Sequence, residues 1–210
     1  MKLLIFLTFL FISTVSVNSQ ILSNFGLKAG LGISNQSWDY KDDINLDFDN
    51  KVGIAPRVFF EFLDLSLFEM QAELGFLQKG FKEKVPIGSV TQPDGTGEFI
   101  NVNNKLNYLS LSALAKLKYT IGVITPYIIL GPQFNLLLSK EIDKGWEVVF
   151  DEFSKNNFGI SVGIGSDVTN VFPFTFLIEY KYERDFIDNF DSPNINIKNY
   201  SHIFLVGIKL

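Results

Sequence analysis

Few residues in this chain have the types needed for catalysis or for binding a transition metal. The 210 residues contain no cysteine and one histidine, His202, which excludes disulfides, thiolate catalysis and any zinc site built from cysteine or several histidines. A hydrolase needs a nucleophile, a base and an orienting group, and His202 falls on the apolar side of its segment. We therefore expect His202 to be an interfacial residue and the protein not to be an enzyme.

Carboxylate pairs could catalyse without histidine, and two pairs are spaced four residues apart, Glu69 with Glu73 and Glu179 with Glu183. In a strand this spacing places both carboxylates on one face. Basic residues occupy the same face of neighbouring segments, so mutual neutralisation is the stronger interpretation. Lys79 and Lys209 share this face and bring the expected lumen to seven basic and five acidic residues. We predict a structural polar network in the lumen, made of Lys28, Arg57, Glu61, Glu69, Glu73, Lys116, Lys118, Glu179, Lys181 and Glu183.

An acidic stretch offers oxygen ligands for a hard cation such as calcium. It contains Asp39, Asp42, Asp43, Asp47, Asp49 and Asn50. It lacks the fixed ligand spacing and closing glutamate of an EF-hand, and a solvated acidic loop is the ordinary alternative. We expect no metal and no cofactor. The formal net charge of -5 leaves no basic surface for nucleic acid.

The elements that must position these residues are strands. From Phe25 onward, apolar and polar residues alternate with a period of two, interrupted by clusters rich in Asp, Asn and Gly. This pattern predicts an all-β meander. We predict eight strands, at residues 25–36, 51–62, 67–81, 106–119, 126–138, 157–168, 173–184 and 199–210.

The predicted strands are near or above the roughly 10 residues that a tilted strand needs to cross a bilayer. The connections between them are alternately long (37–50, 82–105, 139–156, 185–198) and short (63–66, 120–125, 169–172). Outer-membrane barrels alternate short periplasmic turns with long outer loops. The predicted fold is therefore an all-β, eight-stranded antiparallel up-and-down transmembrane β-barrel in the cell outer membrane.

The two faces of the predicted strands differ in kind. One face is apolar, as in Leu27, Ala29, Leu31 and Ile33, while the other carries the polar residues. Lysine or arginine facing lipid at the midplane costs about 2 to 4 kcal/mol, so we place the polar face inside. A soluble sandwich core is the alternative.

Aromatic residues are expected to form girdles at the two ends of the barrel. The periplasmic girdle would contain Phe25, Phe60, Phe62, Phe68, Tyr119 and Phe174, and the outer girdle Trp38, Tyr108, Tyr182 and Tyr200. Pro56 and Pro132 fall mid-strand on the outward face, where each removes a hydrogen-bond donor. We predict a β-bulge at each proline.

The first 19 residues have the features of a secretory signal peptide. Lys2 is followed by an apolar run from Leu3 to Ile12 and by small and polar residues up to Ser19. The apolar run is about half of the roughly 20 residues of a spanning helix. We predict cleavage after Ser19, with residues 20–210 as one outer-membrane β-barrel domain.

Four stretches of the chain resemble the PorT-like outer-membrane β-barrel family. They are Phe25-Gly26-Leu27-Lys28-Ala29-Gly30, Leu106-Asn107-Tyr108-Leu109-Ser110-Leu111, Thr125-Pro126-Tyr127-Ile128-Ile129-Leu130-Gly131-Pro132 and Phe204-Leu205-Val206-Gly207-Ile208-Lys209-Leu210. The resemblance implies a small eight-stranded barrel and admits a role in protein secretion or surface motility. The last stretch is similar to the carboxy-terminal signal read by the barrel-assembly machinery, but it ends in Leu210, where such signals usually carry an aromatic residue.

Four functional classes are open at this point. We favour a non-enzymatic envelope protein whose outer loops contact a surface or secretion partner, polysaccharide or outer-membrane lipid. The first alternative is a channel for ions or small solutes, and the second is an accessory factor in protein secretion. The third is a lipocalin-like soluble barrel. An eight-stranded barrel is just wide enough for side chains to fill, so we expect a plugged lumen.

Overall fold

The computed structural model describes residues 22–40, 48–86, 99–143, 150, 153–171, 173–192 and 195–210. The predicted signal peptide lies outside the described residues, and so do Asp42, Asp43 and Asp47 of the acidic stretch. In the part of the chain that is described, no helix is long and apolar enough to span a membrane.

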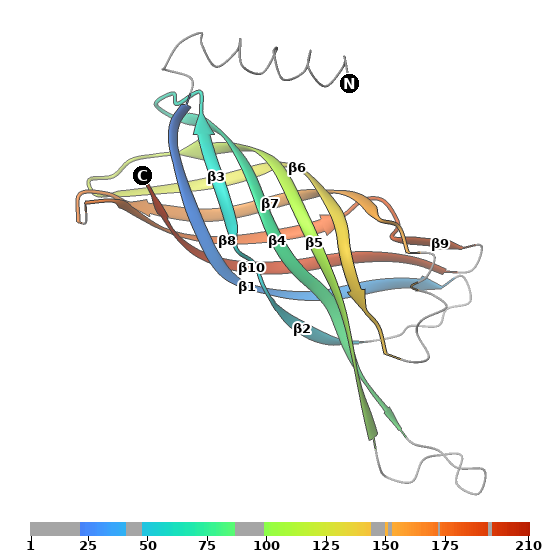
Figure 1. Cartoon of the computed structure of the whole chain (residues 1–210). Coiled ribbons are helices and arrows are strands. Elements are labelled where there is room, and N and C mark those ends of the chain that lie inside the picture. The colour runs from blue at the N-terminus through green and yellow to red at the C-terminus, as the bar shows by residue number, and fades with distance from the viewer. Residues whose placement is uncertain are drawn as a thin grey trace, which may run out of the picture.

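The described strands form one closed antiparallel sheet (Figure 1). β1 pairs with β10 as well as with β2 and β3, so the first and last strands close the ring. β2 and β3 are two halves of one strand, and β9 is a short partner of β10, so the predicted eight-stranded barrel is confirmed. The strands are β1 Leu22–Tyr40, β2 Asp49–Ile54, β3 Arg57–Phe62, β4 Phe68–Pro86, β5 Phe99–Lys118, β6 Ile124–Glu141, β7 Asn156–Val168, β8 Thr175–Asp185, β9 Phe190–Ser192 and β10 Ile195–Lys209.

Short connections lie at one end of the barrel, which we call the turn end, and the opposite end is the loop end. The connections at the turn end are residues 63–67, 119–123 and 169–174. Each of them uses a left-handed backbone at one residue, at Leu63 (φ 54°), Gly122 (φ 64°) and Asn170 (φ 62°). The beginning of β1 at Leu22 and the last residue, Leu210, lie at the turn end as well, as expected for an even number of strands.

The strands are staggered around the ring, which fixes the width of the barrel. A row of paired residues leaves β1 at Ile33 and returns to it at Leu22 after passing through His202, Tyr182, Val162, Leu130, Ala115, Met70 and Phe62. A stagger of this size tilts the strands steeply, as in the roughly 35 to 45° of known barrels. The interior of such a barrel with eight strands is filled by side chains.

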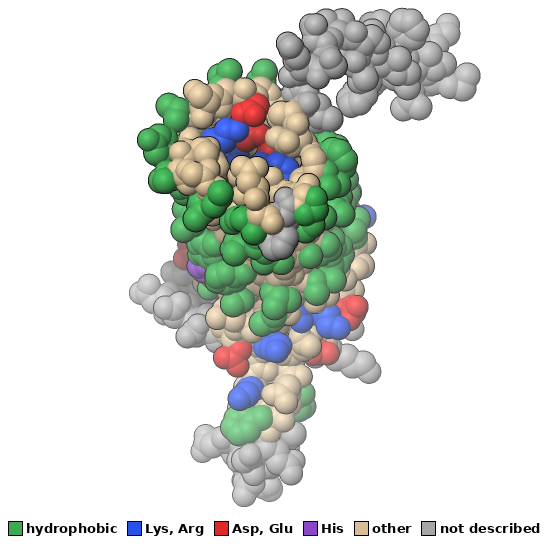
Figure 2. Space-filling model, turned by 90° about the vertical axis from the view of Figure 1, so that its left-hand side faces the viewer, with side chains coloured by type: hydrophobic (Ala, Val, Ile, Leu, Met, Phe, Trp, Pro, Cys, Tyr) green, Lys and Arg blue, Asp and Glu red, His purple; other side chains and the backbone are tan. Residues whose placement is uncertain are grey.

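The outer surface carries a broad apolar band (Figure 2). Its residues expose about half of their area to the surroundings, for example Leu27 with 54% and Leu130 with 51%. The alternating positions on the same strands are buried in the interior. This is the arrangement of a membrane-spanning barrel, since a soluble barrel would reverse it.

The predicted outer girdle is wrong at two of its four residues. Trp38 and Tyr108 are buried inside the barrel, whereas Tyr182 and Tyr200 lie on the outer face. Tyr108 shares the inward face of β5 with Ser110, so its placement follows from the alternation of the strand.

The predicted irregularity at Pro56 is confirmed, and the one at Pro132 is wrong. The strand breaks between β2 and β3, and the pairing with β4 shifts by one residue between Arg57↔Gly75 and Asn50↔Phe81. At Pro132 the register between β5 and β6 continues unchanged, so this proline omits a hydrogen bond without inserting a residue. The bulge of β6 is at Leu138, because Asn107 lies opposite Ser139 and Tyr108 opposite Leu137.

β4 and β5 extend past the barrel wall at the loop end, farther than the sequence predicted. They remain paired to Pro86↔Phe99, whereas β6 accompanies β5 only to Lys105↔Glu141 and β2 accompanies β4 only to Asp49↔Lys82. We call residues 83–86 and 99–104 the ribbon. Among the described strands, none pairs with either outer edge of the ribbon, which projects away from the barrel (Figure 1).

Candidate functional site

The lumen is filled by ion pairs, and its middle layer contains three cations and three carboxylates. Lys28 donates to Glu73 and to Glu179, both at 2.8 Å. The cations are Lys28, Arg57 and Lys181, and the carboxylates are Glu73, Glu179 and Glu183. All six side chains are buried.

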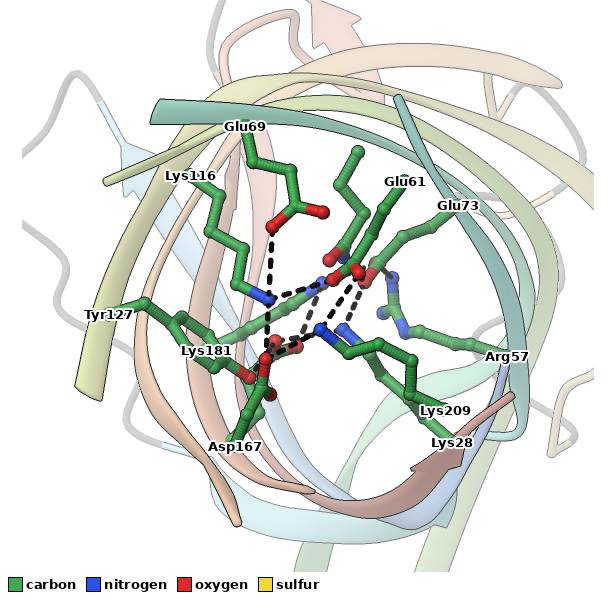
Figure 3. Close-up of polar contacts among 12 residues, drawn as sticks. Lys28, Arg57, Glu61, Glu69, Glu73, Lys116, Tyr127, Asp167, Lys181 and Lys209 are labelled. Atoms are coloured by element: carbon green, nitrogen blue, oxygen red, sulfur yellow. Dashed lines mark hydrogen bonds and ion pairs between the residues drawn. The ribbon is translucent and has the colours of Figure 1, made fainter. Parts of the chain in front are cut away.

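Glu73 is the centre of this layer. It accepts hydrogen bonds from Lys28, Arg57 and Lys181 and from the amide of Gln71. Charge-assisted hydrogen bonds are the strongest available to a buried carboxylate. One side chain therefore joins contributions from β1, β3, β4 and β8 (Figure 3).

A second layer lies nearer the turn end. Lys116 contacts Glu61 at 2.7 Å and Asp167 at 3.1 Å, and Lys209 contacts the same two carboxylates at 2.8 and 2.6 Å (Figure 3). Lys118 joins this layer through Glu69 at 3.0 Å and reaches Asp64 at the mouth at 2.5 Å. The turn end of the lumen is thus closed by a square of alternating charges.

A third layer, nearer the loop end, is built around Asp185. This carboxylate pairs with Lys79 at 3.3 Å and accepts hydrogen bonds from three asparagine side chains. The donors are Asn135, Asn189 and Asn199. A buried carboxylate with four donors is well compensated for its loss of water.

Aromatic rings complete the filling of the lumen. Lys28 lies 4.6 Å from the ring centre of Phe59, Lys79 5.3 Å from that of Tyr108 and Lys116 4.1 Å from that of Tyr127. These distances are within the range of cation–π attraction. The Tyr127 hydroxyl also donates to Glu179 at 2.9 Å and so connects β6 to the middle layer.

A hydrophobic cluster covers the lumen at the loop end, and we call it the aromatic cap. The rings of Phe48 and Phe81 are 4.4 Å apart, and those of Phe150 and Phe153 4.8 Å. Phe48, Phe150 and Phe153 lie outside the strands, and the Lys140 ammonium donates to the carbonyl of Phe150 at 2.5 Å. The buried members of the cap are Trp38, Phe48, Phe81, Leu106, Tyr108, Phe150, Phe153 and Ile197.

The ten lumen residues named from the sequence all face the interior, and the structure brings them together in the two layers nearest the turn end. The sequence reasoning missed Asp167 and Asp185, which are also buried in the lumen, Asp167 in the layer nearest the turn end and Asp185 in the third layer. Asp167 occupies the inward face of a predicted strand, and Asp185 is one residue beyond a predicted strand end. With these two, the three layers of ion pairs hold seven basic and seven acidic residues: Lys28, Arg57, Lys79, Lys116, Lys118, Lys181 and Lys209 with Glu61, Glu69, Glu73, Asp167, Glu179, Glu183 and Asp185. Lys51 is also buried on the inward face of β2, and its ammonium donates to the side-chain oxygen of Asn103 at 2.6 Å.

This arrangement supports a structural role for the carboxylate pairs. Glu73, Glu179 and Glu183 are each ion-paired with a buried cation, which holds their side chains in fixed positions. Within the described ranges, no group of three or more His, Asp or Glu side chains is arranged to hold a metal ion. Asp39 and Asp49, the described carboxylates of the acidic stretch, are exposed.

His202 lies on the outer face, as the sequence indicated. Its Nδ1 atom is 2.7 Å from the Tyr180 hydroxyl, and its ring is surrounded by those of Tyr180, Tyr182 and Tyr200. His202 is therefore separated from the lumen by the barrel wall.

The family model that matches this chain agrees with this architecture. The family model described as outer membrane protein beta-barrel domain matches residues 7–209. Ail, the attachment invasion locus protein of Yersinia pestis, in complex with the heparin analogue sucrose octasulfate, is similar with 17% identity and a TM-score of 0.44, covering 89% of this chain and 98% of that chain.

Two further solved structures are similar at the same level. OprG from Pseudomonas aeruginosa has 10% identity and a TM-score of 0.48 over 91% of this chain and 97% of that chain. Neisserial surface protein A has 14% identity and a TM-score of 0.48 over 90% of this chain and 99% of that chain. None of the curated proteins matches this chain.

Proposed function

The chain belongs to the outer membrane protein beta-barrel domain family, and from this premise we propose that it is a non-enzymatic barrel that acts through its outer surface and conducts no solute through its lumen. The observation that carries the proposal is the filled interior. Three layers of ion pairs and the aromatic cap occupy the path between the two mouths.

Opening this path requires buried charges to separate. Breaking one partner from a buried ion pair costs about 3 to 5 kcal/mol, and each layer contains several such pairs. An open pore would require the ion pairs of more than one layer to separate at once. The free energy needed for this is comparable to the whole free energy of unfolding of an ordinary domain, about 5 to 15 kcal/mol. The energetics therefore favour a permanently closed barrel.

The ribbon is the recognition element in this proposal. Since short turns face the periplasm in outer-membrane barrels, the loop end and the ribbon face the outside of the cell. Phe99 and Ile100 expose 60% and 57% of their area there, and Lys84, which lies opposite Asn101, adds a positive charge close to Ile100. Apolar side chains beside unpaired strand edges can bind an extended segment of a partner by strand addition.

The narrower likeness to PorT-like barrels stays a prediction. So do the role in secretion or motility that it implies, the recognition of the closing strand by the barrel-assembly machinery, and the expectation that the acidic stretch binds no cation. The signal peptide at residues 1–19 is likewise an expectation from the sequence alone.

Conductance and site-specific crosslinking test the proposal together. The mature chain, residues 20–210, is folded into a planar bilayer, where we expect no reproducible single-channel openings. A photo-crosslinking amino acid is then placed in living cells at Ile100 of the ribbon or, as a control of similar exposure, at Ile121 of the turn end (57% and 62%). We expect a discrete adduct from position 100 and none of the same size from position 121.

Stable openings of uniform size would make transport the better interpretation, with the lumen charges as a selectivity filter. A silent barrel with no adduct at position 100 would retain the closed lumen but remove the ribbon as the recognition element. The two parts of the proposal are therefore judged separately.

A further inference from the structure

Arg184 interrupts the apolar band. It is exposed on the outward face of β8, opposite Ile160 of β7 and Tyr200 of β10. Among the described outward positions that form the band, the others carry no Lys, Arg, Asp or Glu. No described carboxylate pairs with Arg184, whereas Lys198, the next outward cation toward the loop end on β10, contacts Asp188 at 3.5 Å.

The surroundings of Arg184 are aromatic and contain the histidine. His202 pairs with Tyr182 across β10 and β8, and Arg184 pairs with Tyr200 in the same two strands. The ring of His202 is 5.2 Å from that of Tyr182 and 6.3 Å from that of Tyr200. A cation and an imidazole thus share one patch, framed by two tyrosines.

The hydrogen bond at His202 leaves one ring nitrogen available. Nδ1 is 2.7 Å from the Tyr180 hydroxyl. When this hydroxyl donates to Nδ1, the proton of a neutral imidazole resides on Nε2, which then acts as a donor to a ligand. The patch therefore offers the planar fork of Arg184 and one N–H of His202.

Position in the membrane defines the ligand. A cation that faces hydrocarbon is unfavourable unless its side chain reaches the headgroup region. Arg184 lies on the loop-end half of β8, two residues beyond Tyr182. The lipid headgroups within its reach are therefore those of the outer leaflet. Arginine binds phosphate with two parallel hydrogen bonds, which suits it to a phosphorylated headgroup.

We propose that Arg184 and His202 bind the phosphate of a phosphorylated glycolipid in the outer leaflet, with Tyr182 and Tyr200 packed against its sugar ring. This site is on the wall of the barrel and is separate from the ribbon. It also rests on different evidence from the closed lumen, because conductance does not report on it.

Retention of a defined lipid tests the site. The mature barrel is folded into phosphatidylcholine nanodiscs that contain either bisphosphorylated lipid A or its dephosphorylated form, and the lipid that stays bound after transfer to detergent is counted by native mass spectrometry. We expect one phosphorylated lipid per barrel and little retention of the dephosphorylated form. Arg184→Gln is expected to weaken retention roughly tenfold, equivalent to about 1.4 kcal/mol, and His202→Gln by a smaller factor.

Lys198→Gln is the matched control, since it removes an outward cation of β10 that already has a carboxylate partner. It is expected to retain lipid as the unmodified barrel does. Heat-modifiable migration on a gel verifies that each variant is folded, and Arg184→Lys, which keeps the charge without the fork, gives an intermediate result if Arg184→Gln does not fold. The proposal is overturned by equal retention of the two lipids, by unchanged retention in the Arg184 variants, or by an equal loss in Lys198→Gln.

Discussion

Replacing Glu73 by glutamine tests whether the lumen is held together by compensated charge. The substitution keeps the size of the side chain and one accepting oxygen, but it replaces the other oxygen by an NH2 donor and removes the charge that Lys28, Arg57 and Lys181 share. Three buried cations then face two carboxylates, Glu179 and Glu183. An uncompensated buried charge costs about 3 to 5 kcal/mol, which is the expected loss in free energy of unfolding.

A second substitution separates the loss of stability caused by the uncompensated charge from a general loss of packing. Lys181→Met removes a cation whose ion-pair partners are Glu73 and Glu179, so the double variant Glu73→Gln/Lys181→Met restores equal numbers of charges in the middle layer. Because a buried ion pair can be replaced by uncharged side chains at little cost, we expect the double variant to recover at least half of the lost stability.

The assay is urea-induced unfolding of the barrel in phosphatidylcholine vesicles, followed by tryptophan emission. Glu141→Gln is the control, since its partner Lys105 is at 2.8 Å but both side chains are solvated, and we expect no measurable change. If Glu73→Gln unfolded at the same urea concentration as the unmodified barrel, or if the double variant were less stable than the single one, charge compensation would not be what stabilises the lumen.

Three other substitutions follow from the structure. Phe81→Ala removes a buried ring from the aromatic cap and is expected to lower the free energy of unfolding by about 3 to 5 kcal/mol in the same urea assay. The variant is still expected to show no single-channel openings in a planar bilayer, because the ion-pair layers remain. Openings would show that the cap alone closes the lumen. Asp167→Asn leaves Lys116 and Lys209 sharing Glu61, and we expect a smaller loss of about 1 to 3 kcal/mol, so a loss above that of Glu73→Gln would contradict the layered description. Gly30→Ala would place a methyl group 1.8 Å from the Phe204 carbonyl oxygen, and we expect a smaller folded fraction by heat-modifiable migration; normal folding would mean that β1 and β10 can separate locally.

Much of the fold could be predicted because a membrane barrel repeats one simple rule. Each strand alternates between lipid and lumen, so the period-two pattern of residues such as Leu109, Ser110 and Leu111 contains both the strand and its orientation. The same rule places Glu73 and Lys181 on the inward face, and in the structure they meet there.

The features that could not be predicted depend on how neighbouring strands pair, which the sequence of a single strand does not show. The bulge at Leu138 is an offset between β5 and β6, and a pairing offset leaves no mark in the sequence of either strand. Pro132 suggested a bulge because a proline lacks a donor, but loss of one bond in a continuous ladder was sufficient.

The aromatic cap was missed for a similar reason. Trp38 lies two residues beyond the predicted end of its strand, and Phe150 belongs to a connection, where no periodicity reports burial. Arg184 was overlooked at the last residue of a predicted strand, although its even number places it on the outward face. Both omissions lie at or beyond a predicted strand end, but only for the cap does the alternation stop giving information about burial.

The pairing of β1 with β10 determines when the barrel becomes complete. Gly26 lies opposite Lys209, whereas the neighbouring strands within the meander are joined by local connections and can pair as soon as they emerge. Contacts so distant in sequence form slowly, and until they form the sheet has two open edges that can pair with other chains. The arrival of β10 therefore sets the time at which the chain stops being prone to aggregate.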